Sequence, residues 1–136
     1  TPRTRPSAAL NARRAAATHI YFLLMDGDFS AFHRVRPSDE IWHLYAGGAL
    51  ELHTIDAAHR YEKHVLTNDL ERGEPAYAVR ANCWQAARPA PGAGWVFCGC
   101  TVAPGFDFAD FEMPPAENLV VAFPAHAAII RELTKR

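Results

Sequence analysis

The chain has 136 residues, with 14 Lys and Arg against 15 Asp and Glu, and a formal net charge of -1. This length is typical of one domain with a single hydrophobic core, and the balanced charge gives no electrostatic reason to expect nucleic acid as a partner. The apolar run at residues 20–25 is far shorter than the roughly 20 residues that cross a membrane, so we expect no membrane partner.

The ends of the domain and its compartment follow from composition. Basic residues near the N-terminus are interleaved with Pro, Ser and Ala, which predicts a flexible arm over residues 1–15 and one folded domain over residues 16–136. The odd number of cysteines, Cys83, Cys98 and Cys100, argues against a disulfide framework and favours the cytoplasm. Cys98 and Cys100 alternate along one predicted strand, so we expect them to share a buried face rather than to bind zinc.

Turn-forming Gly, Pro, Asn and Asp residues recur at the short intervals that are typical of an all-β sandwich or barrel. The predicted strands, in chain order, are residues 18–25, 29–35, 40–46, 49–55, 64–66, 77–79, 84–87 and 95–102. The last of these is a long apolar run, which predicts a strand at the centre of a sheet. Asn82 lies in the turn before residue 84 and is expected to adopt the left-handed conformation.

The pattern changes after residue 104. Residues 104–112 alternate Phe with Asp and Glu, which predicts a half-buried edge segment with its charges in water and its rings in the core. Pro124 can open a helix, and Ile129, Ile130 and Leu133 then lie on one side of it. We therefore predict a C-terminal amphipathic α-helix that packs outside the barrel.

Several sequence blocks resemble one known family. The sequence resembles the cupin_5 (DUF985) group of the cupin superfamily from about residue 16 to residue 133. The blocks that carry the resemblance are FHR at 32–34, SDEIWH at 38–43, YAG at 45–47, LELH at 50–53, WQAARP at 84–89, GCTVAPGFDFADFE at 99–112 and FPAH at 123–126. The resemblance implies a single cupin domain with a double-stranded β-helix, a jelly-roll barrel that holds a small-molecule ligand. It also implies a homodimer, and a further segment upstream of the position of Arg5 that completes the pocket wall and has no counterpart here.

The metal motifs of cupins are only partly present. Cupins usually hold a divalent metal with two His and a Glu from a first motif and one His from a second. His33 matches the first His and Glu40 matches the Glu, with Gly47 following at the expected spacing. Val35 occupies the position of the second His, and Gln85 occupies that of the last.

A divalent metal would therefore be held by His33, Glu40 and Gln85, with His43 as a replacement imidazole. Gln is a weak ligand for transition metals, and His43 on a regular strand points opposite to Glu40. We expect no tight zinc or iron site, and a metal-dependent cupin enzyme remains one alternative.

His33 and Glu40 also suit acid-base catalysis, because a carboxylate that accepts the proton of one imidazole nitrogen fixes the tautomer and raises the basicity of the other. Sugar epimerases of the cupin form use a His base and a Tyr acid in the barrel. By this analogy the resemblance implies an isomerase, an epimerase or a lyase that acts by proton transfer. Tyr21 and Tyr45 are the possible acids, although Tyr45 is expected on the outer face.

The expected ligand pocket has an apolar wall and few polar contacts. We expect Trp42 and Trp84 to form the wall and Gln85 and Arg88 to orient the ligand, with Phe97 in the core. The other alternative is a non-catalytic dimer that binds a metabolite.

Overall fold

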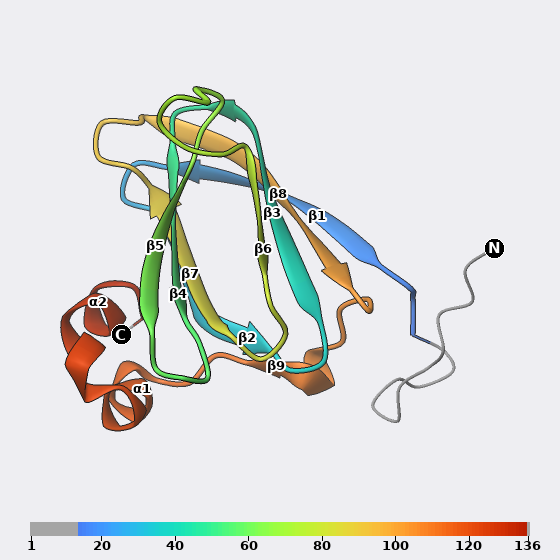
Figure 1. The fold of residues 1–136 in the computed structure, drawn as a ribbon, viewed down its shortest axis with the longest axis vertical. Coiled ribbons are helices and arrows are strands. Elements are labelled where there is room, and N and C mark those ends of the chain that lie inside the picture. Colours follow the sequence, from blue (N-terminus) through green and yellow to red (C-terminus); the bar gives the residue numbers. More distant parts are fainter. Residues whose placement is uncertain (1–13, 136) are drawn as a thin grey trace.

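Residues 14–135 are the part of the chain that the computed structural model describes, and within them the strands form two antiparallel sheets (Figure 1). The four-stranded sheet has the order β1-β8-β3-β6 and the five-stranded sheet the order β5-β4-β7-β2-β9. The strands are β1 (Thr18–Met25), β2 (Ser30–Val35), β3 (Asp39–Gly47), β4 (Leu50–Ile55), β5 (Tyr61–Leu66), β6 (Ala76–Val79), β7 (Trp84–Pro89), β8 (Trp95–Ala103) and β9 (Phe111–Glu112). The prediction of an all-β jelly roll is confirmed.

Every predicted strand is present, with bounds that shift by a few residues. The largest difference is at β5, which begins at Tyr61 rather than at residue 64; the segment Tyr61 to Lys63 is polar and lies on an edge strand, so its pattern is weak. Asn82 has the predicted left-handed conformation, with φ of 69°. Most of the predicted N-terminal arm lies outside the described residues, but Ala15 accepts a hydrogen bond from the backbone N–H of Gly105 at 2.9 Å.

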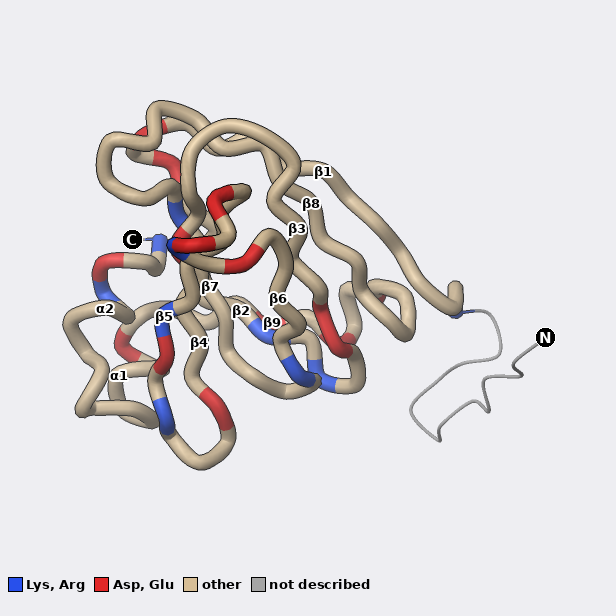
Figure 2. Tube along the Cα trace, turned by 45° about the horizontal axis from the view of Figure 1, so that its top comes forward, with Lys and Arg blue, Asp and Glu red and all other residues tan. Residues whose placement is uncertain are grey.

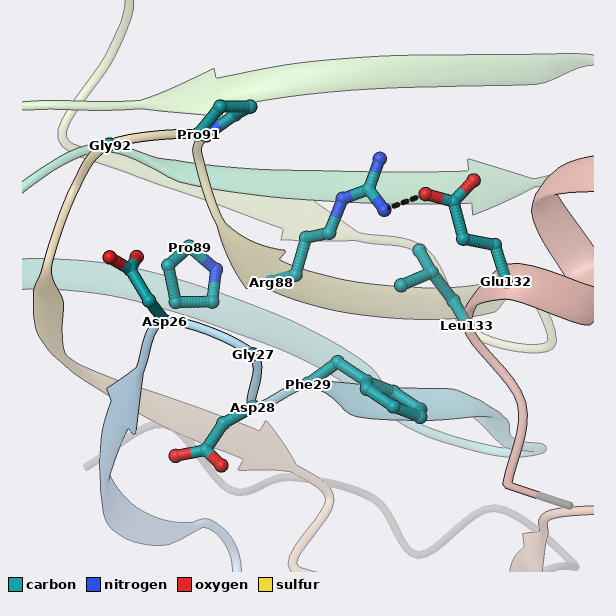
Figure 3. A pocket seen from close by; sticks show the side chains of 10 residues that line it. All are labelled: Asp26, Gly27, Asp28, Phe29, Arg88, Pro89, Pro91, Gly92, Glu132 and Leu133. Carbon is teal, nitrogen blue, oxygen red and sulfur yellow. Dashed lines mark hydrogen bonds and ion pairs between the residues drawn. The ribbon is translucent and has the colours of Figure 1, made fainter.

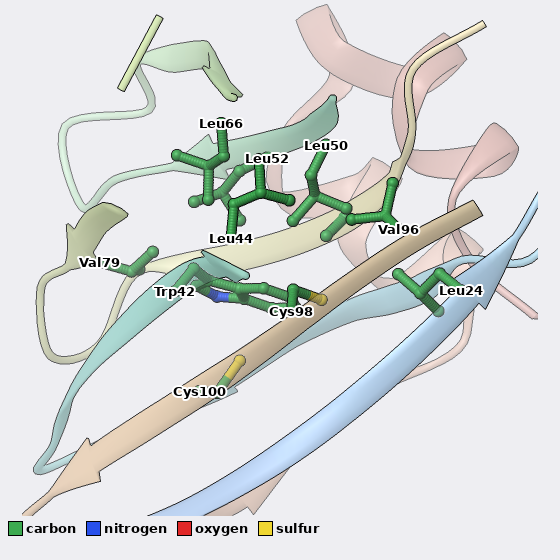
Figure 4. Close-up of a cluster of buried hydrophobic side chains, with 11 residues drawn as sticks. Leu24, Trp42, Leu44, Leu50, Leu52, Leu66, Val79, Val96, Cys98 and Cys100 are labelled. Carbon is green, nitrogen blue, oxygen red and sulfur yellow. The ribbon is translucent and has the colours of Figure 1, made fainter. Parts of the chain in front are cut away.

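One hydrophobic cluster fills the space between the sheets (Figure 4). Trp42, Leu52 and Cys98 are each 0% exposed, because alternate residues of β3, β4 and β8 point to the same inner face. Cys98 and Cys100 share this buried face, as their alternation predicted. The cluster therefore occupies the part of the barrel interior around Trp42.

Two short helices, α1 (Ala116–Ala122) and α2 (Ala127–Glu132), are joined by a 3-10 turn at Pro124–His126. They form a second hydrophobic cluster with the five-stranded sheet, in which Ile130 and Leu133 contact side chains of β2, β4 and β7. The predicted C-terminal helix outside the barrel is confirmed, and α1 adds a helix that the sequence analysis missed. The backbone N–H of Phe32 donates to the carbonyl of Leu133 at 2.9 Å, which ties the C-terminal segment to β2.

Charged residues are unevenly distributed over the two sheets (Figure 2). Strands β1 and β8 contain no Lys, Arg, Asp or Glu, whereas both signs of charge occur around the helices and in the five-stranded sheet. Across residues 14–135, none of the helices has the length and apolar character that a membrane crossing requires.

Candidate functional site

A cavity of about 810 Å³ opens between β1, β2 and β8 and is bordered by the segment that follows β8. This volume is in the range of small-molecule sites. Most of its wall is apolar, and the principal wall residues are Ile20, Phe22, Val102, Phe106, Phe111 and Met113. The polar side chains at its inner end are His33, Glu40 and Cys100.

His33 reaches the cavity because β2 alternates between two environments. Phe32 points toward the helices and His33 toward the barrel interior, where His33 is 8% exposed. Its Nδ1 lies 2.7 Å from the carbonyl oxygen of Ala31. Since a carbonyl can only accept, Nδ1 carries the proton and the neutral ring has its lone pair on Nε2. The tautomer is thus fixed by a backbone carbonyl, which differs from our expectation that Glu40 fixes it.

Glu40 lies near the start of β3 with its carboxyl group inside the barrel, 6% exposed. Its Oε1 is 4.0 Å from His33 Nε2. Burial raises the pKa of the Glu40 carboxyl, and the opposing effects of His33, of the Cys100 thiol and of the Gln85 amide do not cancel this rise. The raised pKa favours the protonated carboxyl group, which is a proton donor, and the Nε2 lone pair of His33 is a proton acceptor.

Gln85 contacts Glu40 rather than the cavity. Its Nε2 lies 3.4 Å from Glu40 Oε1, and its Oε1 accepts a hydrogen bond from the indole N–H of Trp42 at 2.6 Å. Gln85 is 2% exposed, and neither it nor Trp42 lines the cavity. Trp42, Gln85 and Glu40 therefore form a hydrogen-bonded chain behind the cavity, and the predicted ligand contacts of Trp42 and Gln85 stay predictions.

Trp84 and Arg88 lie on the opposite face of β7. Trp84 belongs to the cluster under the helices, with the Arg34 guanidinium 4.5 Å from its ring centroid. Arg88 pairs with Glu51 at 2.9 Å and with Glu132. The prediction placed Trp84 and Gln85 in one pocket, but neighbouring residues of a strand face opposite ways.

Arg88 borders a second, shallower groove at the turn between β1 and β2 (Figure 3). The two carboxylates of this turn are occupied by the backbone, because Asp26 accepts from the N–H of Gly94 and Asp28 from the N–H of Met25. This groove is formed by the turn itself and by the Arg88–Glu132 pair, and it is separate from His33 and Glu40.

His43 and the two tyrosines considered as acids lie on the outer face of the four-stranded sheet. His43 Nε2 is 3.0 Å from Thr101 Oγ1, and Tyr45 OH is 2.9 Å from His19 Nε2. Tyr21 is 67% exposed. The β-bulge in β3 lies beyond His43, between Leu44 and Ala46, and so does not turn His43 inward. The side chains of His43, Tyr21 and Tyr45 do not line the cavity.

The segment after β8 supplies wall residues that sequence reasoning assigned to the core. Phe106 and Phe111 line the cavity, while Asp110 pairs with Arg14 and Glu112 pairs with Arg34. The prediction of rings in the core and charges in water is thus only partly met, because Phe106 and Phe111 line the cavity, Phe108 is exposed, and Asp110 and Glu112 form ion pairs. Phe97, also expected in the core, lies on the outer face and stacks with Tyr21 at 5.6 Å.

The fold and the cavity are those of a small cupin barrel. The chain belongs to the Cupin_5 (DUF985) family of the cupin superfamily, because the sequence model of this family matches residues 1–114. The identification made from the sequence is confirmed.

Solved structures agree with this assignment. A protein from Shewanella oneidensis is 34% identical, with 97% of this chain and 83% of that chain covered and a TM-score of 0.85. A hypothetical protein from Leishmania major is 29% identical, with 98% and 86% covered and a TM-score of 0.85. A dTDP sugar isomerase from Desulfovibrio desulfuricans is 9% identical over 82% of this chain and 71% of that chain, with a TM-score of 0.64, and shows the fold alone. No curated protein matches the sequence.

The donor set in the barrel does not fit the divalent metal that cupins commonly hold. The amide oxygen of Gln85 accepts from Trp42 and is not turned toward His33 and Glu40. In the described range, residues 14–135, no three His, Cys, Asp or Glu side chains converge as ligands. His33 and Glu40 therefore form a two-donor set, and we derive no step through a metal.

Proposed function

We propose that this cupin is an isomerase, an epimerase or a lyase that moves a proton on a small molecule bound in the barrel, with His33 and Glu40 as its acid-base pair. The observation that carries the proposal is the placement of His33 Nε2 and Glu40 Oε1 4.0 Å apart at the inner end of the cavity. A substrate atom can lie about 3 Å from both groups at once, which is the reach that proton transfer needs.

The two groups have different roles in this proposal. His33 acts as the base, because the Ala31 carbonyl holds the proton on Nδ1 and leaves Nε2 free. Glu40 acts as the acid, because burial raises the pKa of its carboxyl group. Gln85 is a positioning residue that holds Glu40 through its Nε2.

Fold analogy supports this reaction type. The Desulfovibrio desulfuricans neighbour is a dTDP sugar isomerase, so a barrel of this shape supports an isomerisation. Cupin epimerases use a tyrosine as the acid, but Tyr21 and Tyr45 of this chain lie outside the cavity. In this proposal Glu40 takes the role of the acid.

The test is proton exchange into carbonyl compounds in D₂O, followed by NMR for the wild-type protein and for the His33→Asn and Glu40→Gln variants. We expect the wild-type protein to speed the exchange of hydrogens next to the carbonyl of a bound compound, and both variants to lose about 10²–10⁴-fold in rate. Gln85→Asn, which changes only the reach of the positioning amide, is expected to lose less. Binding without any exchange would refute the catalytic proposal and favour the non-catalytic binding module.

The proposal includes a homodimer in which a second copy covers the outer face of β1, β3 and β8. Tyr21, Leu23 and Met25 on this face are 67%, 62% and 50% exposed, and β1 is an edge strand without any charged residue. A large exposed apolar face and an uncharged edge strand favour covering by a partner. Contact between this face of two copies would remove the apolar side chains from water and cover the uncharged edge strand.

The proposed compartment is the cytoplasm. Cys83, Cys98 and Cys100 are all free thiols, which is the usual state in a reducing environment. Burial raises the pKa of the Cys98 thiol to about 11, so this sulfur stays protonated and unreactive.

A further inference from the structure

We infer that the substrate is an apolar carbonyl compound with one anionic group, rather than a sugar nucleotide. The inference rests on the proposed function, because it names the substrate class of the same cavity. It is carried by the scarcity of polar groups on the cavity wall and by the position of Lys135.

Most polar side chains near the cavity are already engaged elsewhere. The hydroxyl of Thr18 accepts a hydrogen bond from the N–H of Phe106 at 2.9 Å. Both ring nitrogens of His19 face outer-sheet partners, Thr101 and Tyr45. The polar groups that remain for a ligand are the Ser30 hydroxyl and, at the inner end, the Nε2 of His33, the carboxyl group of Glu40 and the Cys100 thiol.

This set suits one carbonyl group and the carbon next to it. A hexose carries hydroxyls around its whole ring, and burial against phenyl rings and aliphatic side chains would leave several of them without partners. An aryl or alkyl group, in contrast, packs against Phe106, Phe111 and Met113 without losing any hydrogen bond to water. The wall therefore selects against sugars.

Among the described residues, 14–135, one Lys or Arg side chain lies at the cavity. Lys135 lines it, and it is brought there by the hydrogen bond between the Leu133 carbonyl and the N–H of Phe32. Among residues 14–135, no arginine lines this cavity, although arginine is the residue best suited to bind phosphate groups in two-point contacts. One ammonium group matches one carboxylate better than it matches a diphosphate.

The reaction on such a compound balances without any oxidant or reductant. His33 Nε2 takes a proton from the carbon next to the carbonyl, and the electron pair of that C–H bond forms the C=C bond of an enol. The carbonyl oxygen takes the proton of Glu40, and the C=O double bond becomes a single bond. Proton exchange through water returns His33 to its neutral form and Glu40 to its acid form.

The probes are phenylpyruvate, phenylacetone and TDP-glucose, each titrated calorimetrically into the full-length protein. Phenylacetone has the ring and the ketone of phenylpyruvate but lacks the carboxylate. We expect phenylpyruvate to bind about fivefold more tightly than phenylacetone at low salt, as befits one exposed charge pair, and TDP-glucose to bind more weakly than either. Lys135→Met should abolish the preference for phenylpyruvate, whereas Lys63→Met, which removes the same charge from an edge strand away from the cavity, should retain it.

Tighter binding of TDP-glucose than of phenylpyruvate would overturn the inference, and so would an unchanged preference in Lys135→Met. Exchange of the benzylic hydrogens of phenylpyruvate in D₂O is read separately by NMR. Binding of phenylpyruvate without exchange supports the substrate class and refutes the proton-transfer function. Tighter binding of TDP-glucose, together with exchange next to the carbonyl of a TDP-4-keto sugar, would refute the substrate class and leave the proton-transfer function standing.

Discussion

The hydrogen bond between Trp42 and Gln85 can be measured by a double-mutant cycle. In Gln85→Leu, the indole N–H of Trp42 loses its acceptor at 2.6 Å while its side chain remains 0% exposed. A buried donor without a partner costs about 1–3 kcal/mol. We therefore expect this substitution to lower the free energy of unfolding by about 2 kcal/mol.

Trp42→Phe removes the donor and leaves the amide oxygen of Gln85 without a partner, at a similar cost of about 1–3 kcal/mol, to which the lost packing of the larger ring is added. The double variant contains neither unpaired group. Its destabilisation should therefore be smaller than the sum of the two single effects by about 1–2 kcal/mol.

Urea unfolding followed by far-UV circular dichroism measures these energies without depending on tryptophan fluorescence. The matched control is the cycle of Trp84→Phe with Gln85→Leu, because Trp84 lies on the opposite face of the same strand. Because the side chains of Trp84 and Gln85 share no hydrogen bond, that control should show a smaller coupling energy than the Trp42 cycle. Additivity of the Trp42 cycle would refute the hydrogen bond between Trp42 and Gln85.

Three further results are expected. Folding raises the pKa of Glu40 above its unfolded value of 4.5, so the stability that this group contributes is fully present below pH 4.5 and is lost as the pH rises through the folded pKa. Glu40→Gln should therefore gain stability relative to the wild type as the pH rises above 4.5. Melting temperatures of the two proteins that change in parallel with pH would contradict this. Burial of Glu51 is outweighed by the hydrogen bond and charge of Arg88, which lower the pKa of this carboxyl. The stability that Glu51 contributes is present above pH 4.5 and is lost as the pH falls through the folded pKa of this carboxyl group. The Glu51→Gln variant should therefore lose less stability than the wild type when the pH is lowered below 4.5. If the proposed dimer forms through the outer face of β1, Leu23→Glu should give a monomer in light scattering, whereas Val121→Glu, at a position of 83% exposure on α1, should remain dimeric. A dimeric Leu23→Glu variant would exclude this face.

The strands could be predicted from the sequence because their alternation is strong. In β3 the inward positions of Glu40 and Trp42 and the outward position of His43 follow from a period of two, and the structure has them so. Helix α1 could not be predicted as easily, because it has seven residues and no side-chain hydrogen bond at its N-cap, so neither length nor capping marks its start.

The site was only partly predictable. The resemblance to cupins pointed to His33 and Glu40, and both line the cavity. The ligand-contact assignments for Trp84 and Arg88 ignored the alternation of β7, which turns both toward the helices and away from Gln85. The enclosure of the cavity by Phe106 and Phe111 depends on how a nonlocal segment folds back over β2, which no local pattern encodes.

The attachment of the C-terminal segment to β2 has a practical consequence for preparing the protein. Leu133 is hydrogen-bonded to Phe32, one residue away from His33, and Lys135 borders the cavity. A polyhistidine tag fused at the C-terminus would follow shortly after Lys135, and its imidazoles could bring a metal from the affinity column close to His33 and Glu40. Metal bound by the tag would not be distinguished from metal bound by the protein in such a preparation, so an untagged protein is the proper sample for metal analysis and for every binding measurement described above.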